Sequence, residues 1–311
     1  MKPPPFGYRA PETLGEALDA LAEAGADGKV LAGGQSLIPL LNMRLAAPPW
    51  LIDINRVAEL DTLSVMPETR EGAVAPESPG GGAAAAGVRV GALVRHARVE
   101  RSDAAARIQP LLRQALRYVA HPVVRNRGTV VGSLAHADPA AELPAVLALL
   151  GGTVDVASAQ ARRTIPASEF FAGPLESALR PGELAVSAFF PALPPHAGTA
   201  FAEVARRHGD YAMAGVAGVV VLDDDLRVIS ARAGYLSVAA TPLVLDLTGA
   251  VGHRPPGSCD WAAAAAYAKD QVDPEADIHA GTEYRRHLVG ILTERVLRIA
   301  ATDAVQEVSH D

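Results

Sequence analysis

A strand that runs into a double glycine is the feature that most limits how this chain can fold. Residues 30–41 are Val-Leu-Ala-Gly-Gly-Gln-Ser-Leu-Ile-Pro-Leu-Leu. The pattern predicts a strand, a tight loop and a short helix, because apolar runs stand on both sides of the glycines. Paired glycines lack Cβ atoms and can adopt positive φ, so successive backbone N–H groups can converge on an anion. The stretch therefore predicts a phosphate cradle, while the same pattern also fits an ordinary turn.

The side chains that follow the glycines are suited to the same task. Gln35 and Ser36 add hydrogen-bond donors to the backbone N–H groups. The loop is neither a Walker A sequence nor a G-x-G-x-x-G dinucleotide fingerprint. The candidate binding residues in this loop are Ala32, Gly33, Gly34, Gln35 and Ser36.

Composition excludes several classes of partner. The chain has 311 residues and a net charge of −7, without a basic block that could follow a nucleic-acid backbone. No run of about 18 apolar residues predicts a membrane span, and Met1–Pro5 lacks the apolar core of a signal peptide. We therefore expect a cytoplasmic protein of two domains that binds neither nucleic acid nor a membrane.

The single cysteine, Cys259, limits the redox chemistry that this chain can carry alone. One thiol cannot form an internal disulfide, hold an iron–sulfur cluster or build a cysteine-based zinc site. His136 has no second ligand three or four residues further on, and no G-x-S-x-G elbow is present. The sequence thus predicts no metal site and no catalytic residue of its own.

The rest of the first half alternates helical and strand patterns. A capping box at Thr13-Leu14-Gly15-Glu16 opens a helix that ends at Gly25. Strands at 29–32 and 50–54 flank the double glycine and predict a βαβ-like unit. The stretch from Pro67 to Gly87 is rich in Pro, Gly and Ala and predicts a mobile surface loop. Further strands are expected at 63–65, 88–90, 154–156 and 163–165, and helices at 110–120 and 142–150.

A second loop joins glycines to hydroxyl residues. Residues 125–138 are Arg-Asn-Arg-Gly-Thr-Val-Val-Gly-Ser-Leu-Ala-His-Ala-Asp, and Glu142 follows. Asp138 and Glu142 are carboxylates suited to accept hydrogen bonds from ribose or ribityl hydroxyls. Two separate donor-rich loops suit a ligand with a central pyrophosphate and hydroxylated chains on either side.

The second half predicts an antiparallel sheet and a long helix. A proline-rich stretch at 191–195 marks the expected domain boundary. Strands are expected at 201–206, 216–222 and 228–235, with a turn at Asp223–Asp225. A helix over 282–301 should bury one face, formed by Leu288, Ile291, Leu292, Val296 and Ile299.

These motifs together resemble those of the FAD-binding medium subunit of the molybdenum hydroxylases. The resemblance rests on Ala-Gly-Gly-Gln-Ser at 32–36, on Thr-Val-Val-Gly-Ser at 129–133 with the Leu-Ala-His-Ala-Asp-Pro-Ala that follows, and on Asp-Tyr-Ala at 210–212. It extends over nearly the whole chain. Carbon monoxide dehydrogenase medium subunits and the flavin segment of xanthine dehydrogenase are the nearest types.

The resemblance implies an α+β fold in two domains. Residues 1–192 would form an FAD-binding domain of the p-cresol methylhydroxylase type with two α/β subdomains, and residues 196–305 a smaller C-terminal α+β domain with an antiparallel sheet. The first loop and Ser36 would hold the FAD pyrophosphate, and Thr129, Val131, Gly132 and Ser133 would close the site from the other side.

Two implied contacts carry open alternatives. Val131 stands where the family usually has a glycine, so its Cβ either points away from FAD or loosens the loop. Val186 and Tyr211 would lie near the isoalloxazine, but Tyr211 also fits a buried core aromatic with a satisfied hydroxyl.

The implied function is electron transfer within a larger enzyme. A [2Fe–2S] subunit and a large molybdopterin subunit would accompany this chain in a dimer of heterotrimers, and NAD, a quinone, a dye-like carrier or oxygen would accept the electrons. One alternative is a stand-alone flavin oxidase or reductase that uses Tyr211 and Glu203 as its acid or base. A second alternative is an assembly factor with an empty cradle.

Overall fold

The computed structural model describes residues 1–66 and 86–308, which form two compact units. Unit 1 comprises Met1–Ser102, His121–Ala137 and Gly152–Pro191, and unit 2 comprises Asp103–Ala120, Asp138–Gly151 and Ala192–Asp311. Each unit therefore draws on separate stretches of the sequence. The domain limits expected at residues 192 and 196 stay a prediction.

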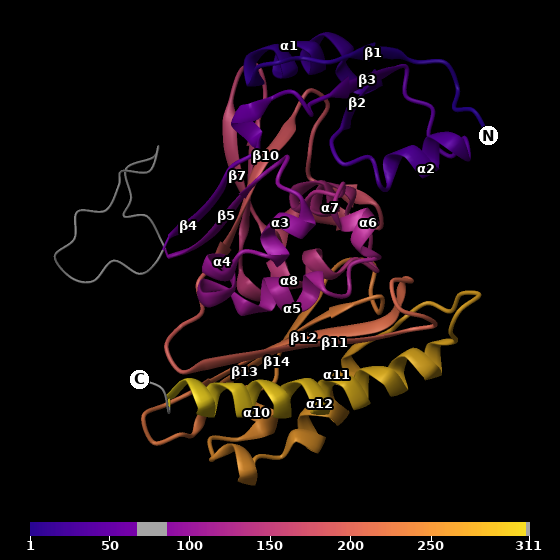
Figure 1. Ribbon diagram of the computed structural model, residues 1–311. Coiled ribbons are helices and arrows are strands. Elements are labelled where there is room, and N and C mark those ends of the chain that lie inside the picture. Colours follow the sequence, from indigo (N-terminus) through magenta and orange to yellow (C-terminus); the bar gives the residue numbers. More distant parts are fainter. Residues whose placement is uncertain (67–85, 309–311) are drawn as a thin grey trace, which may run out of the picture. The chain divides into compact units, whose positions relative to one another are not determined.

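Unit 1 begins with a small parallel sheet. Strands β1 (Gly7–Arg9), β3 (Trp50–Asp53) and β2 (Gly28–Leu31) lie in that order, in the indigo part of Figure 1. Helix α2 (Leu37–Asn42) connects β2 to β3, which confirms the predicted βαβ unit. Helix α1 (Leu14–Ala24) has the predicted capping box at Thr13 and Glu16 and ends at Gly25, whose φ is +55°.

The larger sheet of unit 1 is antiparallel throughout. Its strands lie in the order β4, β5, β10, β6, β7. The bounds are Leu63–Met66 for β4, Gly87–Gly91 for β5, Leu184–Pro191 for β10, Thr153–Ala157 for β6 and Arg162–Pro166 for β7. All four strands that the sequence predicts here are confirmed. The loop expected between β4 and β5 lies, except for its last two residues, outside the described residues.

Short elements complete unit 1. They are η1 (Gly25–Asp27), η2 (Ala58–Leu60), α3 (His96–Glu100), α6 (Pro122–Arg125), α7 (Val130–His136), α9 (Ala167–Phe170) and the hairpin of β8 (Phe171–Gly173) and β9 (Glu176–Ser177). Helix α7 packs on β10 and β5, which places the segment at 129–136 against the larger sheet.

Unit 2 is built on a four-stranded antiparallel sheet in chain order. The strands are β11 (Ala197–Ala205), β12 (Ala212–Leu222), β13 (Val228–Leu236) and β14 (Leu243–Asp246). They confirm the three predicted strands, although β11 begins four residues before the predicted start and ends one residue before the predicted end. Asp223 shapes the predicted turn, because its carboxylate accepts hydrogen bonds from the backbone N–H groups of Asp225 and Arg227.

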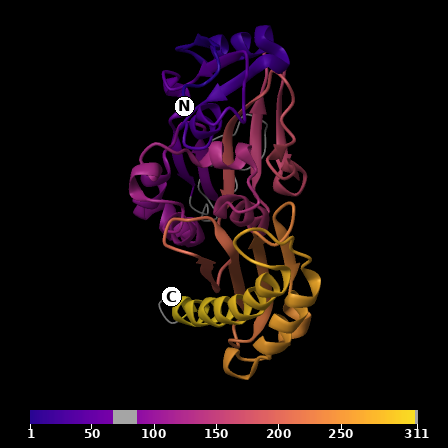
Figure 2. The same ribbon diagram turned by 90° about the vertical axis from the view of Figure 1, so that its right-hand side faces the viewer.

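Helices cover both faces of this sheet (Figures 1 and 2). A Cβ on Gly218 would point at Val296 of α12 (Thr282–Val308), whereas one on Gly234 would point at Ala145 of α8 (Glu142–Leu150). The other helices of unit 2 are α4 (Asp103–Ile108), α5 (Pro110–Leu116), α10 (Thr248–Val251), η3 (Pro256–Ser258) and α11 (Trp261–Gln271). Helix α8 has the predicted bounds, and α5 ends four residues before the predicted end. None of the helices in residues 1–66 and 86–308 is both long and apolar enough to cross a membrane.

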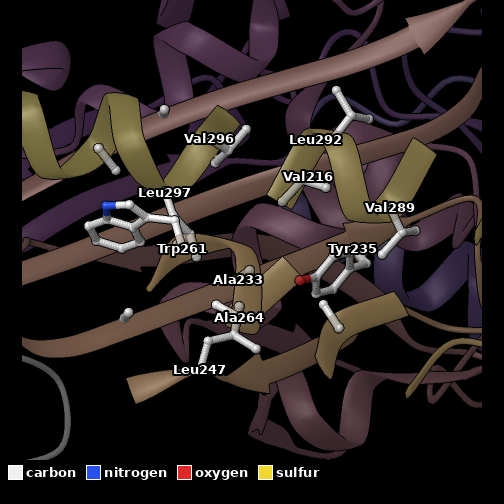
Figure 3. Close-up of a cluster of buried hydrophobic side chains, with 14 of the residues drawn as sticks. Val216, Ala233, Tyr235, Leu247, Trp261, Ala264, Val289, Leu292, Val296 and Leu297 are labelled. Carbon is white, nitrogen blue, oxygen red and sulfur yellow. The ribbon is translucent and has the colours of Figure 1, made fainter. Parts of the chain in front are cut away.

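The core of unit 2 is one continuous apolar cluster between the sheet, α11 and α12. Figure 3 shows the side chains of Tyr235 and Trp261 among those of Val216, Leu292 and Val296. The Tyr235 hydroxyl lies 3.0 Å from the Thr293 Oγ1, so the polar end of this buried ring is satisfied. Burial raises the pKa of Tyr235 above its ordinary value.

The predicted buried face of α12 is partly wrong. Leu288, Leu292 and Val296 are buried, but the side chains of Ile291 and Ile299 are 48% and 51% exposed. The buried rows also include small and polar residues, such as Thr293 and Ala300, which the apolar pattern does not reveal. The buried face is therefore rotated around the helix away from the row of Ile291 and Ile299.

Candidate functional site

The double-glycine loop lies where the sequence predicts it, between β2 and α2. The carbonyl of Leu31, the last residue of β2, accepts a 3.1 Å hydrogen bond from the Ile54 backbone N–H. Gly34 has φ +72°, and its carbonyl accepts a 3.0 Å hydrogen bond from the Ile38 N–H, the second residue of α2. The loop therefore turns sharply at Gly34, which a residue with a Cβ would adopt only under strain.

The backbone of this loop offers donors to a ligand. Within residues 1–66 and 86–308, the N–H groups of Gly33, Gly34, Gln35 and Ser36 have no hydrogen-bond partner. The Gln35 Nε2 donates to the Gly33 carbonyl at 3.2 Å, while Ser36 is exposed and makes no side-chain cap to α2. Four successive open donors in a turn fit a pyrophosphate, because a fixed group of N–H dipoles can surround its oxygens.

Gly33 touches the second predicted loop directly. A Cβ at Gly33 would lie 2.5 Å from the Arg127 carbonyl oxygen and 2.8 Å from the Gly128 Cα. Gly33 does not have a positive φ, so its lack of a side chain serves this close approach of two backbones. The two loops that the sequence singles out are thus neighbours within unit 1.

A polar network, which the sequence analysis missed, connects the same two loops. The Asn55 Nδ2 donates to the Ala32 carbonyl at 2.8 Å, and the Asn55 Oδ1 accepts from the Arg95 Nη2 at 2.6 Å. The Arg95 Nη1 then donates to the Arg127 carbonyl at 2.6 Å. Asn55 and Arg95 therefore form a brace from the first loop to the second.

Asp53 supports this brace from the end of β3. Its Oδ1 accepts hydrogen bonds from the backbone N–H and the Nδ2 of Asn55, and its Oδ2 accepts a 2.6 Å hydrogen bond from the Tyr8 hydroxyl. Burial opposes the charge, but the hydrogen bonds from Tyr8 and Asn55 hold the pKa of Asp53 below its ordinary value. Asp53 is therefore an anion that orients the Asn55 amide.

The second loop enters α7 through a side-chain cap. The Thr129 Oγ1 accepts a 3.1 Å hydrogen bond from the Gly132 N–H, so this hydroxyl oxygen is engaged as the helix N-cap. Val131 is only 2% exposed, so its side chain is buried and leaves the loop surface clear. Of the two alternatives for Val131, the structure supports a Cβ that points into the protein.

His96 packs beneath this loop. Its backbone N–H donates to the Gly128 carbonyl at 3.0 Å, and a Cβ on Gly128 would lie 2.9 Å from the His96 Nδ1. Burial lowers the pKa of His96 to about 4, and neither ring nitrogen has a hydrogen-bond partner among the described residues. His96 is consequently a neutral ring that fills the space under the loop at neutral pH.

Val186 also belongs to unit 1. It is half-buried on β10, and its carbonyl accepts a 2.9 Å hydrogen bond from the Ala92 N–H. This bond continues the pairing of β10 beyond β5. Contact of Val186 with a flavin stays a prediction.

Unit 2 brings Asp138, Glu142 and Tyr211 together, with Glu203 as a fourth member. Partial burial and the charges of Asp138 and Glu142 raise the pKa of Tyr211. Its side chain is nevertheless 67% exposed, so the alternative of a buried core aromatic is wrong. The Asp138 Oδ1 accepts a 2.8 Å hydrogen bond from the Ala140 N–H and closes a local turn.

Glu203 is the most perturbed carboxyl group in this part of unit 2. Burial, followed by the charge of Glu142, raises the pKa of Glu203 to about 8. Its Oε2 is buried without a hydrogen-bond partner among the described residues. Glu203 therefore carries a proton near neutral pH, which the one-dimensional sequence does not show.

Comparison with known proteins covers both halves of the chain. The family model of the FAD binding domain in molybdopterin dehydrogenase matches residues 4–193, and that of the CO dehydrogenase flavoprotein C-terminal domain matches residues 199–300. The 6-hydroxypseudooxynicotine dehydrogenase complex subunit alpha of Paenarthrobacter nicotinovorans is 39% identical, over 96% of this chain and 95% of its own length.

Two solved structures have the same fold over nearly their full length. A chain of quinoline 2-oxidoreductase from Pseudomonas putida 86 is 35% identical with a TM-score of 0.85, covering 98% of this chain and 99% of its own. A chain of carbon monoxide dehydrogenase from Hydrogenophaga pseudoflava is 32% identical with a TM-score of 0.83, covering 97% of this chain and 99% of its own. The α+β architecture with its C-terminal antiparallel sheet is thereby confirmed.

Proposed function

The chain belongs to the family of FAD-binding medium subunits of molybdenum hydroxylases, and from this premise we propose that it carries electrons from a partner subunit to an external acceptor. It is an oxidoreductase subunit with an FAD-binding domain. The observation that carries the proposal is the open set of N–H donors from Gly33 to Ser36, which the brace holds beside the second loop.

The residues of unit 1 fit the pyrophosphate of FAD. The four N–H groups would donate to its oxygens, the Ser36 hydroxyl would add one donor, and the positive φ of Gly34 permits the sharp turn between them. Gly132 and Ser133, at the start of α7, would contact it from the second loop. FAD, when bound, accepts and releases electrons singly or in pairs.

The electrons must come from another polypeptide. The one cysteine of this chain cannot hold a [2Fe–2S] cluster. We therefore expect a small iron–sulfur subunit and a large molybdopterin subunit as partners, assembled as a dimer of heterotrimers in the cytoplasm. The substrate would react on the molybdopterin subunit, and NAD, a quinone, oxygen or another carrier would take the electrons from this chain.

The decisive experiment separates FAD binding from substrate oxidation. The purified chain should bind about one FAD and stay oxidised under anaerobic mixing with quinoline, caffeine, an aldehyde or carbon monoxide. A native complex should be isolated by pull-down with this chain and analysed for iron and molybdenum. In that complex, one of these substrates should reduce the flavin and bleach its visible absorbance. The electron-transfer role requires that difference.

Three results would contradict the proposal. A chain that binds no FAD would support the assembly-factor alternative. Bleaching of the isolated chain by a substrate would support a self-sufficient flavoenzyme, and loss of that bleaching in Glu203→Gln would identify its acid or base. A native complex without iron or molybdenum would remove the expected partners.

A further inference from the structure

Three arginines line a cavity on unit 1, and only one of them, Arg95, takes part in the brace between the two loops. The volume of the cavity is about 530 Å³, within the usual range for small-molecule sites. Arg95, Arg98 and Arg101 line it together with Ser102 and Asn126, and Leu63 and Ala97 form an apolar wall. The three arginines are spaced by three residues along α3 and its caps, so they project from one side of the helix.

The positive charge of this cavity is only partly neutralised. Arg98 is paired with Asp61 at 2.8 Å. Arg95 is half-buried and donates to uncharged oxygens, the Asn55 Oδ1 and the Arg127 carbonyl. Arg101 has no carboxylate within 4.0 Å among the described residues.

Neighbouring carboxylates neutralise the positive charge of this cavity only in part. Glu100, which lies between the arginines in sequence, is engaged by both Nε and Nη2 of Arg125 at 2.9 and 3.2 Å. The charge of Arg127 acts on Arg95 and, after burial, is the second factor that lowers its pKa. The negative charges of Asp61 and Asp53 oppose this effect and act on Arg95 less strongly than Arg127 does. A half-buried guanidinium surrounded by further cations is stabilised when an anion approaches.

We propose that this arginine cavity binds the phosphate group of a small-molecule ligand of nucleotide size. Guanidinium groups present planar pairs of N–H donors that match phosphate oxygens, and Arg95, Arg98 and Arg101 offer them from one side. The Asn126 side chain is exposed and adds an amide donor. The wall of Leu63 and Ala97 would contact the uncharged part of the ligand.

The site is independent of the pyrophosphate cradle, although Arg95 contributes to both regions. The cradle uses backbone N–H groups of residues 33–36, whereas the cavity uses side chains of α3 and its caps. Saturating FAD should therefore leave the cavity available, and this property distinguishes the proposal from the FAD-binding role.

The test is equilibrium dialysis of the full chain with labelled ADP, with and without saturating FAD. ADP should bind in the submillimolar range under both conditions, pyrophosphate should compete, and adenosine should not. Arg101→Gln should weaken ADP binding about tenfold, since it removes one charge-assisted contact. Arg101→Lys should weaken it less, because the charge persists without the fork.

Arg162→Gln is the matched control, because Arg162 is an exposed arginine of unit 1 outside the cavity. It should leave ADP binding unchanged. Tighter binding of ADP than of pyrophosphate would support a ligand of nucleotide size, and equal binding would contradict the proposed contact of its uncharged part with Leu63 and Ala97. Absence of ADP binding, equal weakening by Arg162→Gln, or displacement of ADP by FAD would overturn the proposal. Arg98→Gln provides a second variant if Arg101→Gln does not fold.

Discussion

Different kinds of interaction stabilise the core of unit 2 and the loops of unit 1. Unit 2 has an apolar cluster, in which a hydrogen bond to Thr293 satisfies the buried hydroxyl of Tyr235. The loops of unit 1 are joined by charged and amide groups through Asn55 and Arg95. Apolar packing tolerates some change of shape, whereas a hydrogen-bonded brace depends on each donor and acceptor. The candidate ligand-binding loops are therefore expected to be more sensitive to substitution than the core of unit 2.

One pair of glycines shows the same contrast. A Cβ on Gly33 would lie 2.5 Å from the Arg127 carbonyl, and one on Gly198 would lie 2.1 Å from the Ala300 carbonyl. Both glycines permit two backbones to approach closely. In unit 1 this approach shapes a candidate ligand site, and in unit 2 it allows β11 to pack against α12. A glycine at a close backbone contact thus shapes a candidate ligand site in one unit and permits helix–sheet packing in the other.

The largest effect is expected from Gly33→Val. A branched side chain there would collide with the backbone of Arg127 and Gly128, and overpacking against rigid groups costs about 1–3 kcal/mol or more. FAD affinity should fall by about a hundredfold, as measured by flavin absorbance after gel filtration. Gly15→Val is the control, because no atom lies within 4 Å of a Cβ at Gly15. A normal flavin content in Gly33→Val would remove this loop from the site.

Gly198→Ala should produce the reverse outcome. It would push β11 away from Ala300 and Ala304 and destabilise unit 2 by about 1–3 kcal/mol, while the loops of unit 1 keep their geometry. In a Trp50→Phe background, urea unfolding followed by Trp261 emission should shift to lower urea, because Trp261 lies in the core of unit 2. FAD affinity in the absence of urea should be unchanged. If Gly198→Ala instead lost FAD and kept its full stability, the assignment of Gly198 to stability and not to binding would be wrong.

Local patterns predict the elements of this protein well. The capping box at Thr13 and Glu16, the βαβ unit around the double glycine and the helix at 142–150 all follow from neighbouring residues, and all are confirmed. The first predicted loop, at 32–36, meets the start of the second, at Arg127 and Gly128, within unit 1. The pattern does not show why residue 33 must be a glycine, because the Arg127 carbonyl that a Cβ would meet lies far along the chain.

The missing part of the prediction depends on contacts between distant segments. Asn55 and Arg95 look like ordinary polar residues in sequence, and only the fold places one beside Ala32 and the other beside Arg127. Burial of Glu203 likewise depends on packing of unit 2 and not on its strand pattern. Similarly, the Ile291 side chain is exposed because of where the sheet lies relative to α12, which the helical pattern does not show.

Asn55→Ala should have an intermediate effect confined to unit 1. It would leave the Ala32 carbonyl and one side of Arg95 without their partner, at a cost of about 1–3 kcal/mol. FAD affinity should fall about tenfold in isothermal titration calorimetry. Thr13→Ala is the control, because loss of this helix cap costs about 1 kcal/mol of stability away from both loops. An equal loss of FAD affinity in Thr13→Ala would show that general destabilisation explains the effect.

The smallest effects concern pH, and they should have opposite signs in the two units. The pKa of His96 in unit 1 is lowered from 6.5 to about 4, so the unfolded chain takes up a proton first as pH falls. Because the proton binds preferentially to the unfolded chain, the free energy of unfolding falls as pH falls from about 6.5 towards 4. The pKa of Glu203 in unit 2 is raised from 4.5 to about 8, so the folded chain holds the proton. The resulting contribution to stability is complete below about 4.5 and is lost as pH rises through 8.

The two tryptophans allow this difference to be measured, because Trp50 lies in unit 1 and Trp261 in unit 2. In urea unfolding, the Trp50 transition of a Trp261→Phe variant should weaken by about 1 kcal/mol between pH 7 and 5.5, and His96→Gln should remove the change. The Trp261 transition of a Trp50→Phe variant should weaken by a similar amount between pH 7 and 8, and Glu203→Gln should remove that change. Identical pH profiles for both tryptophans would mean that the two units unfold together. The units would then differ in the contacts that they contain, but not in the pH dependence of their stability.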